Sequence, residues 1–262
     1  METLLLYLAT GAVAGVLAGL LGVGGGLIIV PALVFIFATQ GVPDAIVMHM
    51  ALGTSLATIV MTSISSVRAH HKRGAVLWQV VWRLTPGIVV GTLMGAMLAD
   101  MLSGGVLKRI FGIFALLVAL QMGLAAKPAP HRRLPGRSGM GLAGWIIGGV
   151  SAIVGIGGGS LTVPFLTWCK INIHNAVATS SACGLPIALA GSLGFVITGW
   201  NETALPAFSS GYIYWPAMAS IATASVLFAP LGARLAHALP ADTLKKFFAI
   251  FLALLGARML VG

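Results

Sequence analysis

The sequence of 262 residues is poor in charge, in acidic residues and in cysteine. Only 8% of the residues are charged, whereas a soluble domain uses about 25% to cover its surface. Disordered chains are rich in charge and poor in apolar residues, so the 58% hydrophobic content excludes that class as well. Two cysteines exclude a disulfide scaffold and four-thiolate metal sites. The composition therefore predicts an integral membrane protein, with the lipid bilayer as its main partner.

Long stretches without any charged side chain support this prediction. Residues 3–43 and 138–169 contain no Asp, Glu, Lys or Arg, and several further stretches are equally free of charge. A helix needs about 20 apolar residues to cross the hydrocarbon core. These stretches are too long for the strands of a barrel and lack their alternation. We therefore expect an all-α polytopic protein that crosses the membrane several times, and we interpret the net charge of +10 through the positive-inside rule rather than as a nucleic-acid surface.

Two of the apolar stretches are interrupted by clustered glycines. One cluster runs from Gly22 to Gly26 and the other from Gly155 to Gly159. Each glycine in a helix costs about 1 kcal/mol relative to alanine, so we expect each stretch to form a helix, a break and a short second helix. The short helices are predicted at residues 27–38 and 160–168, with a proline early in each.

The two interrupted stretches belong to an internal repeat. Both contain a GxGGG cluster followed by a proline, and residues 49–55 resemble residues 174–180. Residues 74–78 likewise resemble residues 211–215. The chain is therefore predicted to contain a first membrane repeat at 1–126, a basic cytoplasmic linker at 127–138 and a second membrane repeat at 139–262.

The distribution of Lys and Arg distinguishes two arrangements of the repeats. If each broken stretch crosses the membrane once, the halves are parallel, and the cations, apart from Arg83 within a span, divide 8 to 6 between the two sides. If each broken stretch is a hairpin, each half has that hairpin plus three transmembrane helices, the halves are inverted, and the division is 11 to 3. Since the positive-inside bias orients helices, we favour the inverted topology.

The glycine breaks are the candidate functional site. A broken helix exposes a new N-terminus whose free N–H groups and dipole attract anions, and paired broken helices form the central site of many secondary transporters. Hydroxyl groups in matching positions beside both breaks could bind the same ligand, although they could also cross-link helices or bond their own backbone. The glycines could also serve helix packing. The candidate substrate-binding residues are Gly22, Gly24, Gly25, Gly26, Thr54, Ser55, Gly155, Gly157, Gly158, Gly159, Ser160, Thr179, Ser180 and Ser181.

Two histidines also match in the repeat, about one turn from the hydroxyl groups. His49 and His174 are candidates for gating or protonation, with an interfacial position as the plainer alternative. All five acidic residues lie at the edges of the apolar stretches or in loops. A cation would therefore find no counter-charge in the membrane, and we expect no metal, no cofactor and no catalytic cluster. This pattern favours an anionic substrate and argues against an enzyme.

The ordered motifs resemble a known family, the sulfite exporter TauE/SafE family, also called the 4-toluene sulfonate uptake permeases. The resemblance rests on the doubled GxGGG-x4-P motif, the Thr-Ser pairs at 54–55 and 179–180, and the Gly-x3-Trp stretches at 74–78 and 211–215. It implies a multi-pass transporter of the bacterial inner membrane that carries small sulfur-containing anions such as sulfite or an organosulfonate.

The leading hypothesis is thus a secondary transporter that works by alternating access. An anion channel is the alternative, and a non-transporting membrane assembly protein is a further one. The residues leave open which anion is moved, in which direction, whether a proton or another ion is coupled, and whether the protein forms an oligomer.

Overall fold

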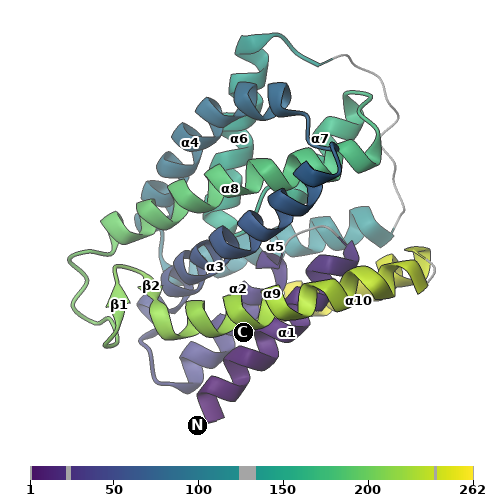
Figure 1. The fold of residues 1–262 in the computed structure, drawn as a ribbon. Coiled ribbons are helices and arrows are strands. Elements are labelled where there is room, and N and C mark those ends of the chain that lie inside the picture. The colour runs from purple at the N-terminus through teal and green to yellow at the C-terminus, as the bar shows by residue number, and fades with distance from the viewer. Residues whose placement is uncertain (1, 22–24, 124–133, 239–240, 262) are drawn as a thin grey trace.

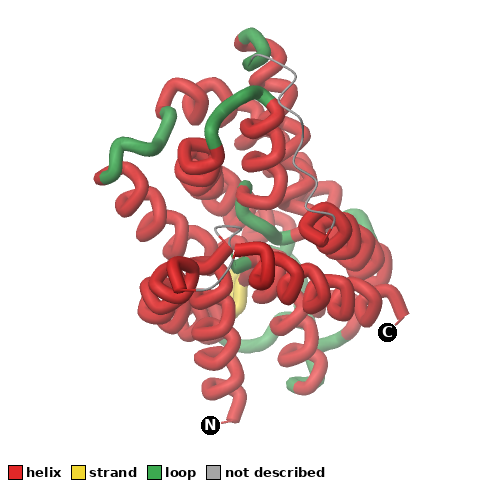
Figure 2. Tube along the Cα trace, turned by 90° about the vertical axis from the view of Figure 1, so that its right-hand side faces the viewer, coloured by secondary structure: helices red, strands yellow, loops and turns green. Residues whose placement is uncertain are grey.

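The protein is almost entirely helical (Figures 1 and 2). The computed structural model describes residues 2–21, 25–123, 134–238 and 241–261. The first half contains α1 (Glu2–Leu21), α2 (Gly26–Thr39), α3 (Asp44–Lys72), α4 (Trp78–Asp100) and α5 (Gly104–Gly123). The second half contains α6 (Arg137–Val154), α7 (Gly159–Trp168), α8 (Ile173–Thr198), α9 (Trp215–Ala238) and α10 (Ala241–Val261). The described parts of the two halves therefore have the same order of long and short helices.

The helices are long and apolar enough for a membrane. Within the described residues, α3, α4, α5, α6 and α8 each meet the length and hydropathy of a membrane span, and shorter apolar helices cover residues 2–18, 26–39 and 215–231. Apolar side chains lie on the outside of many of these helices, for example Trp82, which is 68% exposed, and Leu117, which is 60% exposed. Side chains of this kind are compatible with lipid as the surrounding solvent. The chain is therefore an all-α polytopic membrane protein.

Two local features differ from the sequence predictions. Arg137 and Ser138, assigned to the linker, form the first turn of α6, and the rest of the predicted linker up to residue 133 lies outside the described residues. The loop between α8 and α9 contains a two-residue hairpin, β1 (Ser209–Ser210) and β2 (Ile213–Tyr214), with Gly211 at φ +52° in its turn. These strands are too short to be recognised from hydrophobic alternation.

Helices α3 and α8 run in opposite directions. Gly53 of α3 packs against Phe195 of α8, whereas ten residues later Ser63 packs against Gly184. The position along α3 therefore rises as the position along α8 falls. Figure 1 shows the two helices side by side through the middle of the molecule. The helices α5 and α10 follow the same rule, because Gly112 packs against Leu260 and Gly123 faces Ala249.

The first helix of each half packs against the other half. Helix α1 packs closely along α9 of the other half, and α6 packs in the same way along α4. Glycines allow this close approach: a Cβ atom on Gly11 would collide with the carbonyl oxygen of Ile221, and one on Gly144 with that of Leu84. Small residues at helix crossings are the usual solution in membranes, where packing rather than hydrophobicity joins helices. These positions match in the repeat, so the same contact is made twice.

The threonines of the repeated Thr-Ser pairs make a second reciprocal contact. The hydroxyl oxygen of Thr54 accepts a hydrogen bond of 3.0 Å from the backbone N–H of Tyr214. The hydroxyl oxygen of Thr179 accepts one of 3.1 Å from the N–H of Leu77. Leu77 and Tyr214 occupy the same place in the repeated Gly-x3-Trp stretches. Each half therefore fastens the segment that precedes α9 or α4 of the other half through a buried threonine.

Candidate functional site

The two glycine breaks meet in the interior of the protein. A Cβ atom on Gly26 would lie 2.8 Å from the carbonyl oxygen of Gly155 and 2.9 Å from the Cα atom of Ile156. The hydroxyl of Ser55 donates a hydrogen bond of 2.8 Å to the same carbonyl oxygen of Gly155. Gly155 ends α6 in the left-handed region, at φ +69°, where a side chain would be strained. Gly26, Gly155 and Ser55 therefore build the contact between the breaks, and the predicted site residues Gly22 and Gly24 lie outside the described residues.

The helices after the breaks begin with glycine caps. Helix α2 begins after Gly25 and α7 after Gly158, one residue earlier than predicted in each case, and neither cap makes a side-chain hydrogen bond. The first N–H groups of a helix have no partner inside it, so these two N-termini can receive a ligand. Pro31 and Pro164 lie in the second turn rather than at the start. Their missing N–H groups therefore fall inside the helices, not among the free amides as expected.

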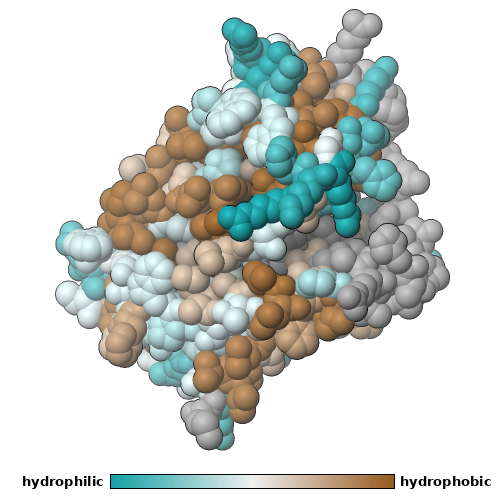
Figure 3. Space-filling model, in the orientation of Figure 1, coloured by the Kyte–Doolittle hydropathy of each residue, from teal (hydrophilic) through white to brown (hydrophobic). Residues whose placement is uncertain are grey.

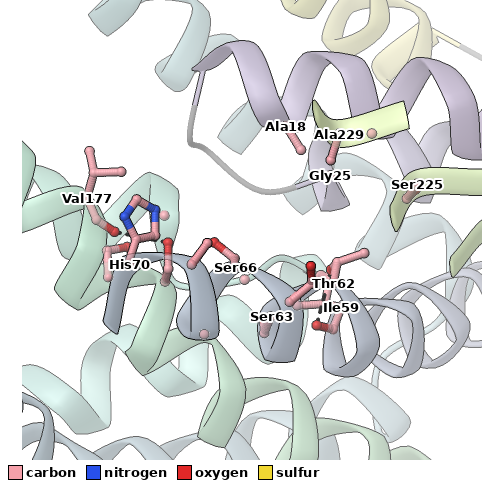
Figure 4. A pocket seen from close by; sticks show the side chains of 18 of the residues that line it. Ala18, Gly25, Ile59, Thr62, Ser63, Ser66, His70, Val177, Ser225 and Ala229 are labelled. Atoms are coloured by element: carbon pink, nitrogen blue, oxygen red, sulfur yellow. Dashed lines mark hydrogen bonds between the residues drawn. The ribbon is translucent and has the colours of Figure 1, made fainter. Parts of the chain in front are cut away.

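A cavity of about 730 Å³ adjoins both of these N-termini. Gly25 lines it from α2, and Gly157, Gly158 and Gly159 line it from the start of α7. The close-up in Figure 4 shows α3 along one side, with Ile59, Thr62, Ser63, Ser66 and His70 in succession, and Ser225 and Ala229 of α9 opposite. The cavity thus lies between α1, α3, α8, α9 and the two short helices.

Buried hydroxyl groups stand next to the N-terminus of α7. Ser180 of α8 lines the cavity, is 1% exposed and has no hydrogen-bond partner for its hydroxyl oxygen among the described residues. A Cβ atom on Gly158 would lie 3.4 Å from the carbonyl oxygen of Ser180 and 3.0 Å from the hydroxyl oxygen of Thr162. The hydroxyls of Ser160 and Thr162 are also buried without a partner in the described part of the chain. A buried polar group without a partner costs about 1–3 kcal/mol, so the hydroxyl of Ser180, which of these three residues is the one in the cavity lining, is suited to a polar ligand.

Helix α3 contributes a polar face that the sequence reasoning missed. Thr62, Ser63, Ser66, His70 and Arg73 follow one another along the cavity. Ser63, Ser66 and His70 are three to four residues apart and thus lie on one side of the helix, with Thr62 beside Ser63 and Arg73 just after the last turn. A polar stripe inside a 29-residue helix is itself a signal, but it has no counterpart in the second half, so the repeat did not reveal it.

The charges around the cavity have one sign. The lining residues include the cation Arg73 and the histidines His70 and His174, and no Asp or Glu is among the described residues that line the cavity. From Ile59 to Arg73 the cavity follows fourteen residues of α3, which is about 21 Å at 1.5 Å per residue. In Figure 3 the most hydrophilic residues gather toward the upper half of the visible face, where α3 ends in Figure 1. The cavity therefore leads from the middle of the helix bundle to its basic end.

The predicted site residues are divided between cavity and scaffold. Ser181 lines the cavity, although its hydroxyl donates to the carbonyl oxygen of Val177 in its own helix. Thr54, Ser55 and Thr179 lie outside the lining, because their hydroxyls are engaged in the contacts described above.

The two matching histidines have different surroundings. His49 is 4% exposed, its Nε2 atom lies 3.1 Å from the carbonyl oxygens of Ala99 and Leu102, and its ring stacks on Tyr212 at 5.1 Å. His174 is exposed and lines the cavity. His49 therefore holds the end of α4, whereas His174 remains a candidate for protonation.

Aromatic side chains pack together at the end of the molecule opposite the basic end. The side-chain amide of Gln40, just after α2, donates a hydrogen bond of 2.7 Å to the hydroxyl oxygen of Tyr7 in α1, so α1 and α2 form a hairpin. Tyr214 packs between the rings of Tyr7 and Phe37 at centroid distances of 6.3 and 5.9 Å. Tyr212 donates to a carboxylate oxygen of Asp100, and burial, followed by Asp100, raises the pKa of this phenol so that it stays protonated. None of these aromatic residues is among the described residues that line the cavity.

Comparison with known proteins gives one consistent result. A family model described as sulfite exporter TauE/SafE matches residues 7–259. A "Probable membrane transporter protein" of Haemophilus influenzae is 40% identical over 98% of this chain and 97% of its own length. Another, of Methanocaldococcus jannaschii, is 29% identical over 98% of this chain and 95% of its own. No solved structure matches the chain. The match of almost every helix to one family model, together with the polytopic fold, shows that the chain belongs to the sulfite exporter TauE/SafE family of membrane transporters.

Proposed function

We propose that this protein is a secondary transporter of small sulfur-containing oxyanions, such as sulfite or a small sulfonate. The single observation that carries the proposal is the uncapped N-terminus of α7, which opens into the cavity beside the unpartnered hydroxyl of Ser180. Backbone amides, a helix dipole and hydroxyl donors are the groups that bind oxyanions. The description of the matching family supports sulfur oxyanions as the class.

The residues proposed to contact the anion are a revised set. They are Gly157, Gly158, Gly159, Ser180 and Ser181 around α7, Gly25 at α2, and Thr62, Ser63 and Ser66 along α3. Arg73 would draw the anion into the cavity, because a cleft lined with one sign of charge raises the local concentration of the opposite ion. The histidines His70 and His174 are the groups in the lining suited to carry a coupling proton.

We further propose that the two halves are inverted repeats that work by alternating access. The opposite directions of α3 and α8, and of α5 and α10, support the inversion. Under the positive-inside rule the end of α3 with Arg68, Lys72 and Arg73 is cytoplasmic. The cavity then faces the cytoplasm, and the aromatic end around Tyr7 and Tyr214 closes the outer side. Transport requires these two ends to exchange their open and closed states.

A binding experiment tests the site. We expect the purified protein to be stabilised in a thermal-shift screen by one or more of sulfite, thiosulfate, sulfate, taurine, sulfoacetate and sulfolactate. Ser180→Ala should leave the melting temperature of the free protein unchanged or slightly higher, since the hydroxyl has no partner. The same change should weaken the best anion about tenfold or more, because a hydrogen bond to a charged group contributes about 1.5–3 kcal/mol.

Two glycine variants complete the test. Gly157→Ala places a methyl group in the cavity, with its nearest neighbour, the Cγ2 atom of Ile59, 3.4 Å away. It should therefore fold and bind the anion more weakly. Gly105→Ala in α5, where a Cβ atom meets nothing within 4 Å, is the matched control and should bind normally. Normal affinity in both Ser180→Ala and Gly157→Ala would refute the site. Vesicle flux that shows neither saturation nor counterflow would indicate that the protein is a channel and not a transporter.

A further inference from the structure

A second hollow lies on the side of the protein between α3 and α9. Its volume is about 510 Å³. It is lined by Met61, Ile64, Ser65, Arg68, Ala69 and Lys72 of α3 and by Val226 of α9. We call these seven residues the α3–α9 groove. It is not part of the site proposed above.

The groove changes from apolar to basic along α3. Met61 at one end is 52% exposed and lies beside Ile64, whereas Arg68 and Lys72 at the other end are both exposed. From Met61 to Lys72 the helix rises by eleven residues, which is about 16 Å. One leaflet contributes about half of the 30 Å hydrocarbon core. The groove therefore has the length and polarity of one leaflet, with its cations at the level of the headgroups.

Charge selects the occupant of this groove. Arg68 and Lys72 are four residues apart and thus on the same face of α3, with the hydroxyl of Ser65 one turn below. No lining residue is acidic, and neither cation forms a salt bridge within the described residues. Two cations above an apolar floor complement a phosphate group that carries acyl chains. Basic pockets between membrane helices on the cytoplasmic side are suited to such headgroups.

The groove also shares a wall with the central cavity. Ser65, Ala69 and Val226 line both spaces, so these side chains of α3 and α9 form the partition between the cavity and the groove. A lipid chain in the groove would cover this partition from outside and keep other lipids and water from entering there. An occupant of the groove would therefore act on the cavity without touching the anion site.

We propose that an anionic phospholipid binds the α3–α9 groove and completes the lateral wall of the cavity. Its phosphate lies at Arg68, Lys72 and Ser65, and an acyl chain covers Met61, Ile64 and Val226. The occupant is a phospholipid of the leaflet at the basic end of α3, not free phosphate, because the apolar half of the groove would stay exposed under a free ion.

Native mass spectrometry of the purified protein tests this lipid site. We expect the protein to retain phosphatidylglycerol in preference to phosphatidylcholine, and the double variant Arg68→Gln/Lys72→Gln to bind phosphatidylglycerol roughly tenfold to thirtyfold more weakly, since each basic residue near the surface contributes about a factor of five. Lys108→Gln/Arg109→Gln at the start of α5 removes the same charge elsewhere and should bind like the unchanged protein. Circular dichroism and gel filtration verify that each variant is folded.

Several outcomes would overturn the lipid site. Equal retention of the two lipids by the unchanged protein would do so, as would an equal loss in the α5 control, which indicates a general effect of charge. Displacement of the lipid by millimolar glycerol phosphate would show that a free phosphate group suffices. The variants leave the residues of the anion site in place, so loss of lipid binding with an intact thermal shift by the anion distinguishes this proposal from the proposed function.

Discussion

Matching residues of the two halves make the same contacts at the helix crossings, but the two matching histidines have different surroundings. The glycines that let α1 pack on α9 and α6 pack on α4 make the same contact twice, as do Thr54 and Thr179. Around the cavity the matching residues diverge, since His49 is buried against the end of α4 whereas His174 lines the cavity. The described residues that line the cavity lead to the basic end of the molecule, so the matching histidines, which lie toward opposite ends, meet different surroundings.

The strongest way to break this equivalence is to widen a helix crossing. Gly11→Val and Gly144→Val should each prevent close packing, because the added side chain would occupy the space of the carbonyl oxygen of Ile221 or Leu84. We expect both variants to lose most of the folded protein, with similar severity, measured by gel filtration in detergent and by thermal unfolding. Gly141→Ala, where a Cβ atom meets nothing within 4 Å, is the control. A large effect in only one of the two valine variants would contradict the equivalence.

A smaller effect is expected at the threonines. Thr54→Val and Thr179→Val keep the shape of the side chain but remove the acceptor for a backbone N–H of the other half. Each change should lower stability by about 1–3 kcal/mol, the cost of an unsatisfied buried donor, and should leave anion affinity unchanged. Thermal unfolding and a ligand titration measure the two quantities. If affinity falls while stability is retained, the threonines belong to the binding site after all.

The histidines should sharpen the difference between the halves. His49→Gln should lower the melting temperature, because it removes the stacking on Tyr212 and disturbs the hydrogen bonds to Ala99 and Leu102. His174→Gln should leave the melting temperature unchanged, since its side chain is exposed, but should reduce transport where a proton is coupled. The measurements are thermal unfolding and vesicle uptake across pH 5 to 8, the range in which a histidine titrates. The reverse pattern would exchange the two roles.

Local signals predicted the helices well and their partners poorly. The glycine clusters placed the starts of α2 and α7 within one residue, because the cost of glycine in a helix acts locally. The partners of the threonines in the Thr-Ser pairs were not predicted. The N–H bound by Thr54 lies 160 residues away in the chain, and nothing near Thr54 indicates it.

Comparison of the two halves identified only part of the cavity lining. It singled out residues present in both halves, such as Thr179, many of which build the scaffold. Ser63, Ser66 and His70 line the cavity but have no matching polar residue in α8, so comparison of the halves could not find them. A search for polar side chains on one face of an apolar helix would have identified this stripe from the sequence.

The depth of the cavity has an electrical consequence. Water and ions that fill it bring the potential of the basic end to the level of Ile59, about halfway along α3. Most of the membrane voltage then falls across the remaining half, between the touching glycine breaks and the aromatic end. A monovalent anion that crosses this short layer gains or loses up to about 2.3 kcal/mol per 100 mV. A negative interior would thus favour outward movement of the anion, so that transport without a coupled ion should run toward export.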